Sequence, residues 1–591
     1  MDSEVKETAA SPTMERLDLR CAIAAFPEAY VAVDDMKFGR RSAGAGLLEA
    51  LCRYADKDGY ALAVTSEADL HPLHFAMAQF QDSLPTANTV ALSDQVALAR
   101  YGTFYSPGPI LTDQAWARRA RSDDAYSIVG VNHTVATLQA TPSLCRYLFD
   151  PLQPWDALIC TSHSVKSAIE TLFESYLSYL DSRGIQAPRP PVQLPVIPLG
   201  VHCDHFDATN ERQATASSFR KARGIGEDDI VLLSFGRIDP ATKAHPVPLF
   251  LSVERAQREM VGDPKLHVVM VGTFLPAKAA RQEIVNSARI YAPSVNVHWV
   301  DGKDPALCQA SWQAADVFLS LSDNIQESFG LTPIEAMAAS LPSIVSDWNG
   351  YKETVVHGET GLRIPTGFPD SSFGLGAELS NRYCSNLMSE SGYLHSVAQL
   401  TYVDVRKCSE AIVALARNHT LRKQMSVKSR ARAVQNYAWQ VVLTQYRDTF
   451  DELNAIRSLR SGTIVRTGLT EPIRPDHGDP LKMFGGYPTR TLSLTTRLSI
   501  ARSDARDLLD LLLQQPMCGH PQCTRADPED MKYLVDVLMD REISVQDLSE
   551  RFPRLSRAEL LSACVWLMKY DVVDAMPDTI GSEPMPTDPV H

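Results

Sequence analysis

Short apolar runs alternate with longer amphipathic segments along most of the first 450 positions. In the first half the apolar runs occupy residues 21–26 (CAIAAF), 60–65 (YALAVT), 127–131 (SIVGV) and 157–160 (ALIC). Runs of this length, bounded by turn residues, are typical of buried strands, and the helical segments between them indicate crossover helices. The first half therefore predicts a doubly wound parallel sheet.

A second alternating series begins after residue 224. Its apolar runs lie at residues 230–234, 266–271, 295–300, 316–321 and 342–346. The fold class predicted is α/β, with two Rossmann-like domains that face a cleft, at residues 15–205 and 206–456. The second domain ends in a crossover helix. A proline-rich segment at residues 187–198 (APRPPVQLPVIP) predicts a linker between the two.

The pattern weakens downstream of the second series. Residues 367–399 predict an insertion, and residues 457–497, which are polar with several Gly and Pro, predict a flexible linker. Residues 498–580 carry three or four amphipathic segments and resemble a winged-helix module, so a small, mainly helical C-terminal domain is expected. This domain holds more acidic than basic residues, which favours protein contact or self-association over nucleic-acid recognition.

Composition narrows the class of protein. The 591 residues include 45% hydrophobic residues, and the formal net charge of −14 disfavours broad attraction to a phosphate backbone. The 11 cysteines are scattered, which indicates reduced thiols rather than a disulfide framework. Neither a signal peptide nor an apolar run of bilayer length is present, so a cytoplasmic protein is expected, with peripheral membrane contact left open.

The most informative motif is ESFGLTPIEAMAASLP at residues 327–342. It places Glu327, Gly330 and Glu335 where a strand turns into a helix, and the free amides of a helix start form a site for a diphosphate. Two carboxylates beside such a site suit the hydroxyls of a nucleotide sugar. The alternative for Glu335 is a capping box with a proline at the first helical position.

The motif resembles the Glu-x7-Glu signature of the family 4 (group 1) retaining glycosyltransferases, which have the GT-B fold. The resemblance extends over residues 20–454 and includes FGRID at 235–239, Lys243, and the segments at 197–206, 346–362 and 437–446. It implies transfer of a sugar from a UDP-, GDP- or ADP-linked donor to a carbohydrate, lipid or small-molecule acceptor, with retention and without a metal or other cofactor.

The resemblance also assigns the site residues. Arg237 and Lys243 correspond to cations that bind the diphosphate and stabilise its developing charge, a large catalytic term wherever it is preorganised. Glu327 is assigned to sugar hydroxyls, and His133, at the carboxyl end of a predicted strand, to the donor sugar. The remaining donor-binding residues are Gly44 and Gly46 in an N-terminal glycine loop, and Gly236, Ser328, Phe329, Gly330, Leu331 and Glu335.

Alternatives stay open at several positions. Arg237 and Lys243 also fit solvated surface charges, and His133 fits a structural histidine. Ser340, Ala244 and the Asn349-Gly350-Tyr351 run depart from the family's glycine positions. A catalytically silent sugar-nucleotide sensor, or another GT-B enzyme such as an epimerase or phosphorylase, is the rival function.

The CGHPQC run at residues 518–523 brings ligand-type side chains together. Cys518, His520 and Cys523 give three local ligands, with Asp527 following, whereas structural zinc takes four with paired spacing. A turn with buried thiols, and no metal, is expected here.

Overall fold

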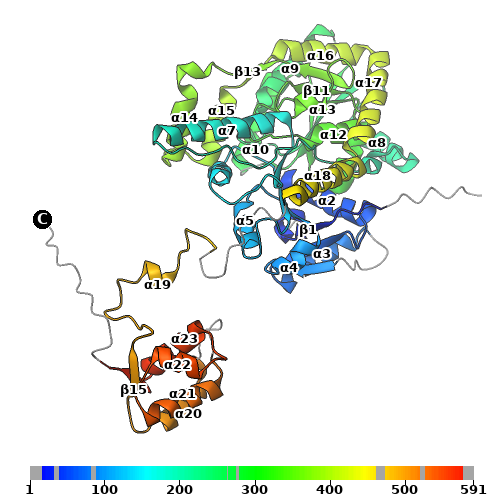
Figure 1. Ribbon diagram of the computed structural model, residues 1–591. Coiled ribbons are helices and arrows are strands. Elements are labelled where there is room, and N and C mark those ends of the chain that lie inside the picture. Colours follow the sequence, from blue (N-terminus) through cyan, green and yellow to red (C-terminus); the bar gives the residue numbers. More distant parts are fainter. Residues whose placement is uncertain are drawn as a thin grey trace, which may run out of the picture. The chain divides into compact units, whose positions relative to one another are not determined.

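The computed structural model describes residues 16–31, 39–80, 88–261, 264–274, 278–460, 473–518 and 526–576 (Figure 1). The chain divides into two compact units, Met1–Ile473 and Arg474–His591. Among the described helices, none is both long and apolar enough to cross a bilayer.

The first unit begins with a six-stranded parallel sheet. In spatial order its strands are β3 (Asn88–Ala91), β2 (Tyr60–Val64), β1 (Cys21–Ala24), β4 (Thr103–Ser106), β5 (Ser127–Asn132) and β6 (Ala157–Cys160). The associated helices are α1 (Pro27–Tyr30), α2 (Gly39–Tyr54), α3 (Leu70–Met77), α4 (Gln95–Arg100), α5 (Thr112–Arg119), α6 (Ala140–Cys145) and α7 (His163–Ser182). Cys21 and Ile23 point into one core and Ala22 and Ala24 into another, so both faces of the sheet are buried.

A second parallel sheet follows within the same unit. Its order is β12 (Gly361–Ile364), β11 (Ser343–Ser346), β10 (Val317–Ser320), β7 (Ile230–Phe235), β8 (Leu266–Gly272) and β9 (Asn296–Asp301). Its helices are α8 (Asn210–Ala222), α9 (Pro246–Glu259), α10 (Lys278–Tyr291), α11 (Pro305–Ala314), α12 (Leu331–Ala338), α13 (Tyr351–Thr354), α16 (Val405–Arg417) and α17 (His419–Arg432). The two doubly wound sheets expected from the sequence are confirmed.

The proline-rich segment is not a free linker. It runs parallel to β6, where the Cys160 N–H donates to the Pro195 carbonyl and the Ile197 N–H donates to the Cys160 carbonyl, at 2.9 and 3.0 Å. Prolines lack the N–H that a further strand would need, which confines such a segment to the edge of a sheet. The segment still leads from the first half of the unit to the second, but residues 193–197 are paired with the edge of the first sheet.

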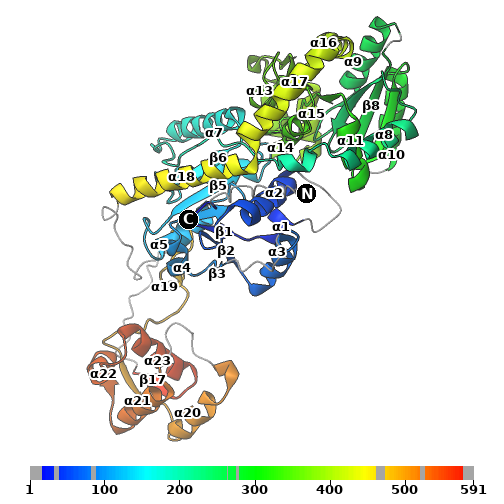
Figure 2. The same ribbon diagram turned by 90° about the vertical axis from the view of Figure 1, so that its right-hand side faces the viewer.

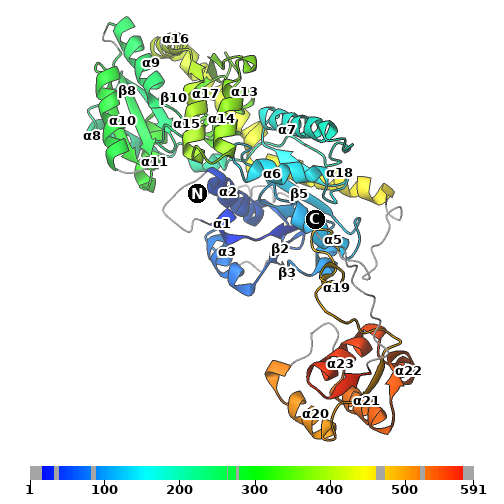
Figure 3. The ribbon, with the colours of Figure 1, turned by 90° about the vertical axis from the view of Figure 1, so that its left-hand side faces the viewer.

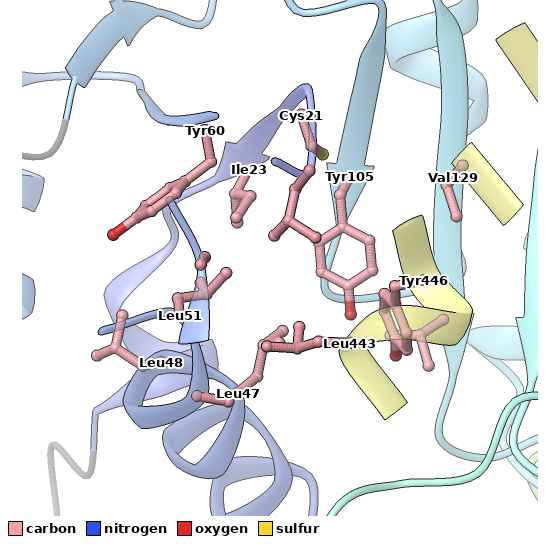
Figure 4. Close-up of a cluster of buried hydrophobic side chains, with 14 of the residues drawn as sticks. Cys21, Ile23, Leu47, Leu48, Leu51, Tyr60, Tyr105, Val129, Leu443 and Tyr446 are labelled. Carbon is pink, nitrogen blue, oxygen red and sulfur yellow. The ribbon is translucent and has the colours of Figure 1, made fainter. Parts of the chain in front are cut away.

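Helix α18 (Trp439–Arg460) returns from the second half of the unit to the first sheet (Figure 2). Its residues Leu443 and Tyr446 share a core with Ile23 and Tyr105 of the first sheet (Figure 4), and the Tyr105 and Tyr446 rings lie 5.7 Å apart. The crossover helix therefore packs the end of the unit onto its beginning.

The weakly patterned insertion is folded. The short strands β13 (Thr366–Gly367) and β14 (Tyr402–Val403) pair antiparallel and close a segment that holds α14 (Leu375–Cys384) and α15 (Glu390–Gln399) (Figure 3). The rings of Tyr383 and Tyr393 stack at 4.5 Å, and the Tyr383 hydroxyl accepts the Leu138 N–H at 3.3 Å. The insertion thus reaches the first half of the unit.

The second unit has its own core. A three-stranded antiparallel sheet, in the order β16 (Ile543–Ser544), β15 (Arg497–Ile500) and β17 (Val573–Ala575), packs with helices α20 (Ala505–Leu513), α21 (Pro528–Asp540), α22 (Val545–Arg551) and α23 (Arg557–Lys569). A four-residue helix, α19 (Pro480–Met483), precedes them. The structure therefore has the expected helical C-terminal region.

A fully buried ion pair stabilises the first sheet. The two terminal guanidinium nitrogens of Arg118, Nη1 and Nη2, donate to Asp156 at 2.6 and 2.8 Å, and both side chains are 0% exposed. Asp156 also accepts the Ile128 N–H and the Gln153 N–H, so its carboxylate orders the start of β5 and the turn before β6.

We expect Asp156→Ala to lower the free energy of unfolding of the first unit by roughly 3–5 kcal/mol, because it leaves the Arg118 charge buried and unpaired. Glu174→Ala, which breaks the exposed pair with Arg189, is the control and should cost less than about 1 kcal/mol. Denaturant titration followed by tryptophan fluorescence measures both. Equal losses would contradict the role given to Asp156.

Candidate active site

A cavity of about 310 Å³ lies where the carboxyl ends of the two sheets face each other. The first sheet contributes residues directly after β5, and the second contributes the loops after β7, β8, β9 and β10. Doubly wound sheets bind ligands at this edge. The predicted site residues in its lining are His133, Gly236, Arg237, Lys243, Glu327, Ser328, Phe329, Gly330, Leu331 and Glu335.

The loop after β7 orients Arg237 through a short relay. Arg237 Nη1 donates to the Thr242 hydroxyl at 3.1 Å, and that hydroxyl donates to the Asp239 carboxylate. Asp239 also accepts the Ala241 N–H at 2.9 Å. Burial lowers the pKa of Arg237 from its ordinary value, against the pull of Asp239 and Glu327, but a guanidinium stays charged in proteins.

Lys243 ends the same loop and forms an ion pair with Glu327. Its ammonium donates to Glu327 Oε2, and the two side chains are 22% and 12% exposed. Burial alone would lower the pKa of Lys243, but the adjacent Glu327 carboxylate outweighs it and raises that pKa above its ordinary value. Lys243 is therefore held charged at the wall of the cleft.

Helix α12 begins at the cleft with Gly330 as its N-cap. Gly330 has φ +87°, and a Cβ there would stand 2.1 Å from a ring carbon of Tyr351, so only glycine fits. No side chain caps this helix start. Glu335 is the fifth helical residue, not the third, so the capping-box alternative for Glu335 is wrong, and the first amides of α12 carry no side-chain cap.

Ser328 joins the two halves of the unit next to the cleft. Its hydroxyl donates to the His133 carbonyl and its carbonyl accepts the Ser162 hydroxyl, each at 2.8 Å. The Glu353 carboxylate accepts the His163 N–H at 2.6 Å at the start of α7. The backbone of His133 is thereby fixed beside the turn that contains Ser328.

The part of the chain that forms the second sheet matches a known protein family. Residues 216–373, which contain the relay, the ion pair and α12, match the model of the family described as glycosyl transferases group 1. Over these residues the chain is similar to the group 1 glycosyltransferases. The segment predicted to hold the donor motifs, from Gly236 to Glu335, lies wholly inside the match.

Curated relatives are similar over part of their length. The D-inositol 3-phosphate glycosyltransferase of Geodermatophilus obscurus is 31% identical over 182 residues, which cover 29% of this chain and 36% of the relative. The D-inositol 3-phosphate glycosyltransferase of Corynebacterium diphtheriae is 27% identical over 275 residues, which cover 45% of this chain and 59% of the relative. The chain thus spans less than two thirds of the length of these relatives.

Among solved structures, HepE of Anabaena in complex with UDP aligns with 14% identity and a TM-score of 0.46. The alignment covers 73% of this chain and 99% of the HepE chain.

Several lining residues of the cleft were not predicted. Gly272 is the last residue of β8, and Thr273 and Gly302 directly follow β8 and β9. A Cβ at Gly272 would stand 1.7 Å from the Gly236 carbonyl oxygen. The sequence signal that could have indicated these lining positions is a glycine at the end of a buried parallel strand. Thr242 and Asp239 were missed because only the folded loop shows that they hold Arg237.

Two departures from the family pattern have structural consequences. Asn349 has φ +38°, and its side-chain amide donates to the Glu327 carbonyl at 2.6 Å, so it fixes the backbone of a site carboxylate. Ser340 has φ +61° at the end of α12, where the Leu341 N–H donates to the Ala336 carbonyl. This is the helix end at which glycine is preferred.

The predicted glycine loop is wrong at Gly44 and Gly46, because both lie inside helix α2. A Cβ at Gly44 would stand 1.9 Å from the Ala29 carbonyl oxygen, and one at Gly46 would stand 2.7 Å from Trp439 Nε1. The two glycines allow α2 to pack closely on α1 and α18. Neither lines the cleft, although Gly44 lines a small adjoining cavity with His133.

Within the described parts of the chain, no group of three or more His, Cys, Asp or Glu side chains could hold a metal ion. His520 and Cys523 of the CGHPQC run lie outside those parts. Cys518 is described, and its carbonyl accepts the Trp566 indole N–H at 2.9 Å.

We expect Ser340→Gly to raise the free energy of unfolding of the first unit by roughly 1 kcal/mol, because glycine removes the cost of the left-handed backbone. Ser340→Ala keeps that cost and is the matched control, which should give no gain. Thermal unfolding of the three proteins tests this. An equal gain in the alanine variant would attribute the effect to the hydroxyl instead.

Proposed function

We propose that this protein transfers a hexosyl group from a nucleotide sugar to an acceptor hydroxyl, with retention at the anomeric carbon. The observation that carries the proposal is the convergence of Arg237, Lys243 and the uncapped start of α12 on one cavity that also contains two carboxylates. Two cations and a helix start together suit a diphosphate. Glu327 and Glu335 suit the hydroxyls on either side of it.

The arrangement supports one orientation of the donor. The diphosphate lies against Arg237, Lys243 and the first amides of α12, and Glu335 accepts hydrogen bonds from the ribose diol. The base of the nucleotide lies at the part of the cleft lined by Gly272 and Gly302, which have no side chains. Glu327 then faces the sugar hydroxyls, and the acceptor enters from the side of the first sheet, near His133.

Charge development explains why two cations are needed. As the bond from the anomeric carbon to the phosphate oxygen breaks, negative charge grows on the leaving diphosphate, and Arg237 and Lys243 stabilise it. The acceptor oxygen bonds to the same face of the anomeric carbon, and its proton passes to the departing phosphate. Donor binding alone would not require this stabilisation, which argues against a silent sensor.

We expect Arg237→Ala and Lys243→Ala each to lower kcat by about 10²–10³ fold, with smaller changes in donor affinity, because the charge develops mainly in the transition state. Glu335→Gln should instead raise the donor KM with stability nearly unchanged. Lys407→Ala removes an exposed cation of α16 and is the control. Steady-state kinetics with a panel of UDP-, GDP- and ADP-sugars separates these effects. Control-like kinetics in all three site variants would overturn the proposal.

We also expect transfer to proceed without a divalent metal, because the two cations and the helix amides supply the countercharge. Activity measured in excess EDTA should match untreated protein. Loss of activity in EDTA, with recovery on adding Mg²⁺ or Mn²⁺, would contradict this assignment of the countercharge.

A further inference from the structure

A second cavity, of about 700 Å³, lies against the loop that holds Arg237 and is lined by its residues 239–241. Its walls come from this loop, the start of α9, helix α10 and helix α15 of the insertion. The volume is within the roughly 300–1,000 Å³ of small-molecule sites. Its polar lining residues are Asp239, His245, Glu283, Ser287, His395 and Gln399.

The polar groups of this cavity favour a neutral ligand. Asp239 and Glu283 are carboxylates that would repel an anion, and the lining residues that the structure describes include no Lys or Arg. Burial lowers the pKa of His245, helped by the nearby His395 and opposed by Glu283, which favours an uncharged imidazole at neutral pH. The carboxylates, the amide and the hydroxyl of this lining can form hydrogen bonds with a ligand that carries many hydroxyl groups.

The apolar part of the lining suits a sugar ring. Pro240, Pro246, Val247 and Ile284 lie in the same cavity and present C–H surface beside the polar groups. A carbohydrate has this combination, because its hydroxyls project from the ring edge and its C–H groups form an apolar face. Charged and strongly apolar ligands each match only part of the lining.

The cavity contacts the relay that orients Arg237. Asp239 lines the cavity, and its carboxylate accepts the Thr242 hydroxyl, which in turn accepts Arg237 Nη1. A hydroxyl of a bound ligand that competes for Asp239 would loosen Thr242 and shift the guanidinium in the cleft. Such a contact would couple a ligand in this cavity to Arg237 in the cleft.

We propose that this cavity binds a neutral mono- or disaccharide as an effector and that the Asp239–Thr242–Arg237 relay transmits its presence to the cleft. The binding site is independent of the proposed transfer activity, whereas the coupling rests on it. The proposal gives the insertion at residues 367–399 a function in effector binding, because His395 and Gln399 form one wall of the cavity.

Binding is tested on the full chain by saturation-transfer NMR with glucose, maltose, sucrose and trehalose, and with glucose 6-phosphate as an anionic comparison. Ser287→Trp fills the cavity from α10, and Asn286→Trp places the same ring on the same helix outside the cavity lining. At least one neutral sugar should bind wild type and Asn286→Trp, and bind Ser287→Trp at least about tenfold more weakly, the change expected from losing about 1.4 kcal/mol.

Binding of no neutral sugar, tighter binding of glucose 6-phosphate than of glucose, or equal binding by the two tryptophan variants would overturn the site. Coupling is measured as the change in UDP-glucose affinity when the bound sugar is saturating. Thr242→Val, which breaks the relay, should retain sugar binding and lose that change. If the saturating sugar changes the UDP-glucose affinity of Thr242→Val as much as that of wild type, the relay is overturned. Sugar binding without any nucleotide binding would count against the proposed transfer activity alone.

Discussion

The ion pair between Lys243 and Glu327 is the interaction on which the candidate site depends. It joins the loop after β7 to the turn before α12, so the two segments that line the cleft are fixed relative to each other. It also keeps Lys243 charged where burial would otherwise favour the neutral amine. An ammonium has three donors, so a bound diphosphate can share Lys243 with Glu327 without displacing it.

The rest of the unit holds this pair at the edge of a parallel sheet. Strands buried on both faces place their carboxyl ends together, and the loops that follow them form one wall of the cleft. Ser328 and the returning helix α18 bring the first sheet to the opposite wall, through hydrogen bonds at His133 and Ser162 and the core around Tyr446. These contacts hold the two walls of the cleft together.

The sequence predicted both sheets because most of their strands are continuous apolar runs. Strands β3, β4 and β12 were missed, since they are short and carry polar residues such as Asn88, Thr103 and Arg363. Most of the site was predictable because its residues cluster in two motifs at strand ends. The relay through Thr242 was not, because it depends on the side-chain geometry of one folded loop. Gly44 and Gly46 were misplaced because a glycine pair signals a loop and a close helix contact equally well.

We propose that the diphosphate of a nucleotide lies against Lys243 and that its ribose lies against Glu335. NMR of the full chain titrated with UDP, GDP and ADP, with the phosphorus and ribose signals followed together, tests both placements. We expect one nucleotide to shift its β-phosphorus signal in wild type and to lose that shift in Lys243→Ala, while Glu335→Gln loses only the contact to the ribose protons. A β-phosphorus shift that is the same in wild type and Lys243→Ala would contradict the proposal.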